Sequence, residues 1–120
     1  MSQAHSTLDG LWQLTHATHE GEQAPELVIE RTLLALHGGT YEIRFAEQMA
    51  DCGALAFDPD EANGFVLTSA SGHNAGRVIP CLFQRKGDLL RVCFGFAGVR
   101  PTEFTAAIGS GRYLATYRKT

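Results

Sequence analysis

His16 is the residue whose type and position most directly suggest chemistry. It lies two residues beyond Leu14 and four beyond Trp12 in the alternating segment 10–19, so an uninterrupted strand would turn all three side chains to one side. A histidine that faces a ligand cavity can act as a general base or hydrogen-bond donor near pH 7, or ligate a haem or a metal. The alternatives are a histidine satisfied by a neighbouring tyrosine or threonine, or one exposed at the mouth of a barrel.

The spacing of the histidines and carboxylates in the sequence does not favour a metal site. His16 and His19 have opposite strand parity, so they share a side only across a bulge, and no carboxylate–histidine spacing stands out. We therefore expect neither a metal nor a cofactor.

The cysteines are odd in number, widely spaced and without a Cys-x-x-Cys pair. They are Cys52, Cys81 and Cys93. We interpret them as small buried hydrophobes in a reducing compartment. Cys93 alternates with Val92 and Phe94, so it faces outward if those two face inward, and no His or Asn at a motif-like distance indicates a catalytic thiol.

Two further segments could carry a function. Residues 71–77, SGHNAGR, are glycine-rich without the spacing of a phosphate loop, and predict an inter-strand loop that can act as a lid. The block from Arg100 to Phe104, RPTEF, is either a binding loop at a barrel rim or a structural segment. In the structural interpretation Pro101 sets a turn, Phe104 plugs the barrel, and Arg100 pairs with Glu103 or with backbone.

The elements that must position these residues are strands. Eight apolar or alternating segments are separated by short turns rich in glycine, with room for one helical turn in 20–30. They are residues 10–19, 32–37, 40–45, 51–57, 64–69, 77–84, 88–96 and 112–119. The sequence therefore predicts an all-β single domain over 1–120, ordered over about 8–119, as an eight-stranded antiparallel up-and-down barrel or a sandwich. Pro80 argues for an edge or a bulge in its strand.

Strand parity predicts a large, aromatic and nearly uncharged interior. Its members are Trp12, Leu14, Tyr41, Ile43, Phe45, Leu55, Phe57, Phe65, Leu67, Cys81, Phe83, Leu90, Val92 and Phe94. From these and the few polar groups near them we predict a set of ligand-binding residues. They are Leu14, His16, Tyr41, Ile43, Phe45, Phe57, Phe65, Phe83 and Tyr113. The same interior could instead fill a small barrel to native density.

The opening Gly10-Leu11-Trp12 resembles the Gly-x-Trp signature of lipocalins. That resemblance implies that the tryptophan lies at the closed end of the barrel, with a late arginine packed over it, for which Arg118 is the natural match. Together with LDGLWQL, GGTYEI, GALAFDP, KGDLLRVCF and GSGRYL, the RPTEF block resembles a family of small uncharacterised bacterial lipocalin-like domains, which implies a calycin-type barrel.

Three functions are compatible with these expectations. The main hypothesis is a protein that binds a hydrophobic or aromatic small molecule in a lipocalin-like barrel. The alternatives are a cofactor-independent cyclase or isomerase of a natural-product pathway, with His16 as base or hydrogen-bond donor, and a scaffold that binds a partner on its outer face. With a net charge of −3, scattered basic residues and no long apolar stretch, we expect no nucleic acid and no membrane as partners, and a cytoplasmic location. Homodimerisation through an exposed strand face is compatible with all three functions.

Overall fold

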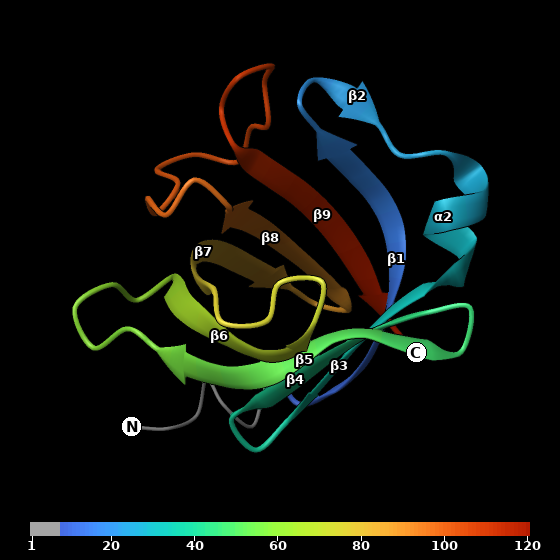
Figure 1. Ribbon diagram of the computed structural model, residues 1–120, viewed down its shortest axis with the longest axis horizontal. Helices are drawn as coiled ribbons and strands as arrows, with labels where there is room; N and C mark the ends of the chain where they lie inside the picture. Colours follow the sequence, from blue (N-terminus) through green and yellow to red (C-terminus); the bar gives the residue numbers. More distant parts are fainter. Residues whose placement is uncertain (1–7) are drawn as a thin grey trace.

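Residues 8–120, which the computed structural model describes, contain a single antiparallel sheet that closes on itself (Figure 1). The elements are β1 (Gly10–His19), β2 (Glu22–Gln23), α2 (Glu26–Arg31), β3 (Thr32–His37), β4 (Thr40–Phe45), β5 (Gln48–Phe57), β6 (Gly64–Gly72), β7 (Val78–Lys86), β8 (Leu89–Gly95) and β9 (Arg112–Lys119). Neighbours pair in the order β2-β1-β3-β4-β5-β6-β7-β8-β9, and β1 also pairs with β9. The predicted eight-stranded up-and-down barrel is confirmed, with β2 as a short addition to β1.

Helix α2 is the helical turn expected near Pro25. Pro25 accepts hydrogen bonds from the backbone N–H groups of Val28 and Ile29. The helix ends where Thr32 takes an extended conformation and its hydroxyl donates to the Val28 carbonyl at 2.7 Å. Because Ile29 packs against the core, the helix covers part of one side of the barrel near β1 (Figure 1).

The predicted interior residues lie in the core or pack against it, except Phe45. Phe45 is the last residue of β4 and is 40% exposed, because the barrel wall ends there. Pro80 lies in a strand paired on both sides rather than at an edge, but the pairing with β8 begins only at the next residue, Cys81. The missing N–H of Pro80 is therefore outside that ladder.

Trp12 is fully buried at one end of the barrel, which we call the closed end. Its indole N–H donates to the Leu8 carbonyl at 3.0 Å. The cations over the ring are Arg85, 5.1 Å from its centroid, and Lys119, 5.5 Å away. The expectation for Arg118 is wrong: the β1–β9 register places Lys119 opposite Trp12, so Arg118 points outward and is exposed.

A β-bulge in β1 reverses the expected direction of His16. Leu14 pairs with Tyr117, but the next pair is His16 with Thr116, so one extra residue of β1 lies between two consecutive residues of β9. The alternation shifts at that point, so Ala17 is buried and His16 is exposed on the outer wall. The prediction that His16 faces inward is therefore wrong.

The connection between β8 and β9, residues 96–111, forms a strap on the outer wall. Cys93 lies outside the barrel core yet is fully buried, and its thiol donates to the Thr105 carbonyl at 3.4 Å. Arg100 pairs with Asp58 at 2.5 Å rather than with Glu103. Phe104 does not plug the barrel, because its ring lies 3.9 Å from the Arg91 guanidinium.

Hydrogen bonds also connect the strap to the turn after β1. The Glu20 carboxylate accepts the backbone N–H groups of Gly109 at 2.7 Å and Gly111 at 3.2 Å, and Gly21 donates to the Ala106 carbonyl. These hydrogen bonds lower the pKa of Glu20. The end of the barrel opposite Trp12, which we call the open end, is thus bordered by two connected loops.

Candidate functional site

A buried carboxylate lies inside the barrel at the open end. Asp51 of β5 is only 4% exposed. Its Oδ1 accepts the Ser69 hydroxyl of β6 at 2.5 Å, and its Oδ2 accepts the Tyr41 hydroxyl of β4 at 3.1 Å. The side-chain amide of Asn74 donates to the same Oδ2 at 3.2 Å. We call these four residues the polar network.

The local backbone explains how the polar network is assembled. The β5–β6 register shifts between Cys52 and Gly53. A side chain at Gly53 would collide with the Thr68 carbonyl, so only glycine allows the two strands to approach here. This bulge lets Asp51 and Ser69 meet on the inner face, next to Tyr41.

The loop between β6 and β7 connects the polar network to an aromatic group. Arg77 donates to the Asn74 side-chain carbonyl at 3.4 Å and to the Phe96 main-chain carbonyl. Its guanidinium also lies 5.4 Å from the centroid of the Phe96 ring. The β6–β7 loop, for which the sequence left a lid role open, therefore contacts both the polar network and the Phe96 ring.

Aromatic side chains form the opposite part of the open end, and we call them the aromatic wall. Phe94 stacks on Phe96 with centroids 5.8 Å apart, and lies 5.6 Å from Tyr113. The His19 ring lies 6.1 Å from Tyr113 in an edge arrangement. Phe94 is buried, Phe96 and Tyr113 are half-buried and His19 is exposed, so apolar surface remains accessible here.

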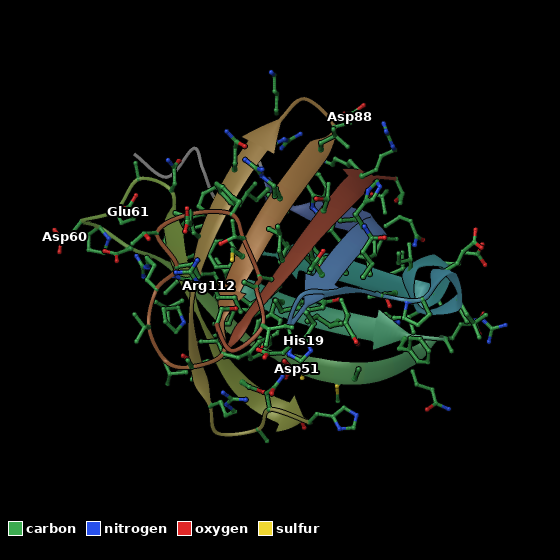
Figure 2. All side chains as sticks on the ribbon, turned by 90° about the horizontal axis from the view of Figure 1, so that it is seen from above. His19, Asp51, Asp60, Glu61, Asp88 and Arg112 are labelled. Carbon is green, nitrogen blue, oxygen red and sulfur yellow. The ribbon has the colours of Figure 1, made fainter. Side chains whose placement is uncertain are left out.

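Figure 2 shows His19 and Asp51 toward one end of the barrel and Asp88 at the opposite end. The phenols at the open end are neutral hydrogen-bonding groups near pH 7. Desolvation by burial and, to a smaller extent, the Asp51 carboxylate raise the pKa of Tyr41 to about 12, while the hydrogen bond with Ser69 acts in the opposite direction. Burial also raises the pKa of Tyr113.

The predicted ligand-binding residues lie in several separate parts of the structure. Tyr41 and Tyr113 lie in the site, and Ile43 is half-buried on the same strand as Tyr41. Three predicted members instead pack on one another, with centroids 5.1–6.0 Å apart. They are Phe57, Phe65 and Phe83. Leu14 is buried in the core near Trp12, Phe45 is exposed, and His16 lies on the outer wall.

Sequence reasoning missed Asp51, Ser69 and Asn74 as site residues. Asp51 did carry a signal, because it precedes the inward-facing Leu55 by four residues and therefore shares its parity. A charged residue at the start of a strand is usually exposed to solvent, so parity alone does not single out Asp51 as a site residue.

Two cavities lined by described residues lie away from the barrel centre. One, of about 330 Å³, is on the outer wall between the end of α2 and the β4–β5 turn, where Arg31, Leu33 and Ala46 contribute. The other, of about 10 Å³, lies at the closed end near Leu36 and Phe57 and has room for about one water. The core side chains around the barrel axis are at most 7% exposed.

No family model, curated protein or solved structure matches the chain. The resemblance to lipocalin-like domains therefore stays a prediction. Among residues 8–120, no helix is long and apolar enough to cross a membrane. The same residues contain no group of three or more His, Cys, Asp and Glu side chains that could hold a metal ion.

Proposed function

We propose that this protein binds a small apolar or aromatic molecule at the open end of its barrel. The observation that carries the proposal is the aromatic wall, where inward-facing Phe96 and Tyr113 stay half-buried beside the buried Phe94. Aromatic faces left partly open beside a few fixed polar groups are typical of small-molecule sites.

The packing of the interior determines where such a ligand binds. Phe65 and Phe83 stack at 5.1 Å and, with Phe57, fill the barrel toward the closed end. This packing supports a ligand position at the mouth, against the aromatic wall, rather than at the barrel centre.

The enzymatic alternative loses its expected base. His16 is exposed on the outer wall, and the polar contact of its ring is with the neighbouring Thr15 hydroxyl at 3.4 Å. From there it cannot act on a molecule inside the barrel.

The test uses N-phenyl-1-naphthylamine, a neutral probe whose fluorescence rises in apolar surroundings. We expect saturable binding, weakened about tenfold or more by Phe96→Ala or Tyr113→Ala, because each removes an aromatic face worth about 1.5 kcal/mol or more of contact. Phe104→Ala is the matched control, since it removes a half-buried ring on the outer wall.

Thermal unfolding of each variant establishes that the barrel is retained. Absence of saturable binding, or equal weakening by the control and by the wall variants, would refute the proposal.

A further inference from the structure

Within the described part of the chain, no cation pairs with the buried Asp51 carboxylate. Its partners Ser69, Tyr41 and Asn74 are neutral donors. Within residues 8–120 the ion pairs formed are Arg44–Glu42 and Arg100–Asp58, and neither involves Asp51. A carboxylate removed from water is usually paired with a positive charge, because neutral donors replace only part of its hydration.

The carboxylate also has acceptor capacity that described residues do not use. Two oxygens provide about four acceptor positions. Oδ2 accepts Tyr41 and Asn74, whereas Oδ1 accepts only Ser69. The network can therefore accept one further donor without losing a hydrogen bond of the barrel wall.

Asn74 is the member of the network that is easiest to displace. Tyr41 and Ser69 belong to paired strands, but Asn74 belongs to the loop after Gly72 and before Gly76, both at positive φ. Its amide reaches Asp51 from this loop through the hydrogen bond to Oδ2. Arg77 is already bound to the Phe96 carbonyl and to Asn74, so it is held away from Asp51.

We propose that Asp51 selects ligands whose aromatic body carries a protonated amine, and that Asn74 occupies part of that amine position in this structure. The inference rests on the proposed function, because the aromatic wall holds the body of the ligand. The amine supplies the positive charge that the buried carboxylate lacks, and the β6–β7 loop moves as Asn74 gives way.

Three probes with the same ring test the selection: 2-phenylethylamine, 2-phenylethanol and 3-phenylpropanoate. Calorimetric titration at neutral pH should show the amine binding at least about tenfold more tightly than the alcohol, and the carboxylate most weakly. Asp51→Asn should reduce the ratio of amine affinity to alcohol affinity to about one. Asp88→Asn is the charge-matched control at the closed end, and should leave this ratio unchanged.

The loop is tested separately. Asn74→Ala should tighten amine binding severalfold, whereas His73→Ala, an exposed neighbour in the same loop, should not. If Asp51→Asn fails to fold, the amine-to-alcohol ratio of the unmodified protein and the Asn74→Ala result still decide the matter.

Equal affinities for amine and alcohol, or an amine preference that survives Asp51→Asn, would overturn the inference. If the alcohol and the naphthyl probe bind through Phe96 while the amine has no advantage, the proposed function holds and only the selection fails. If none of the aromatic probes binds, both fail.

Discussion

The surroundings of Trp12 can be tested residue by residue. Arg85 and Lys119 both lie within 5.5 Å of the ring centroid, whereas Arg118 points outward. A cation over an indole contributes about 0.5–2 kcal/mol. Arg85→Ala should therefore lower the free energy of unfolding by about 1 kcal/mol, and Arg118→Ala by no more than about 0.5 kcal/mol.

Denaturant unfolding followed by the fluorescence of the single tryptophan measures both variants. Arg85→Ala should also increase quenching of Trp12 by acrylamide, because the ring loses part of its cover. A larger destabilisation by Arg118→Ala than by Arg85→Ala would contradict the assignment.

Residue directions could be predicted wherever a strand keeps its alternation. Trp12 and Phe65 face inward as period-two patterns require. His16 could not be placed, because the bulge beside it depends on how β1 meets β9, about a hundred residues later in the chain. Alternation from Leu55 is compatible with the inward direction of Asp51, but its partner Asn74 comes from a loop whose path no alternation describes.

At the scale of elements, two hairpin turns have the same backbone geometry and different sequences. The β3–β4 turn uses Gly38 and Gly39 at φ 54° and 83°, and the β4–β5 turn uses Ala46 and Glu47 at φ 52° and 70°. Positive φ at both central positions favours Asn-Gly or Gly-Gly, and non-glycine residues cost about 1–2 kcal/mol there.

The double variant Ala46→Asn, Glu47→Gly should therefore stabilise the protein by about 1 kcal/mol, after the greater freedom of glycine in the unfolded chain is subtracted. Gly38→Ala is the reverse control: a methyl group there meets no atom within 4 Å, so only backbone strain acts, and stability should fall by about 1 kcal/mol. Thermal unfolding measures both. Destabilisation by the double variant would contradict the strain argument.

The strap is the segment whose path could not be predicted from the sequence pattern. Most strand bounds follow from local alternation and turn residues, and 10–19, 32–37, 40–45 and 112–119 were predicted with the bounds observed. The path of residues 96–111 depends on distant contacts such as Arg100 with Asp58. An outward-facing yet uncharged Cys93 was the local hint that something covers this wall.

At the scale of the whole molecule, closure of the barrel buries Tyr41 and Tyr117 and half-buries Tyr113, the third tyrosine of the chain. Desolvation raises the pKa of Tyr41 to about 12, raises that of Tyr113, and raises that of Tyr117 well above 10. Burial also raises the pKa values of the Cys81 and Cys93 thiols. The three phenols and two thiols therefore stay neutral in the folded protein at alkaline pH values at which the same groups ionise in the unfolded chain.

Stability should therefore fall steeply in alkali. Below about pH 10 the tyrosines are protonated in both states, so their contribution is complete. Above it the unfolded chain binds fewer protons than the folded chain, so the free energy of unfolding decreases with pH. The contribution of Tyr41 is lost as the pH rises toward about 12, and that of the thiols begins to decline from about pH 9.

Urea unfolding at a series of pH values, with near-ultraviolet absorbance of tyrosinate recorded in parallel, measures this effect. Tyrosinate should appear together with loss of the barrel, not before it, and Tyr41→Phe should make the decline between pH 10 and 12 shallower. The phenylalanine variant should be somewhat less stable at neutral pH, because Asp51 loses a donor. Titration of all three tyrosines near pH 10 in a barrel that stays folded would show that closure does not shield them, and would remove the basis for a desolvated site around Asp51.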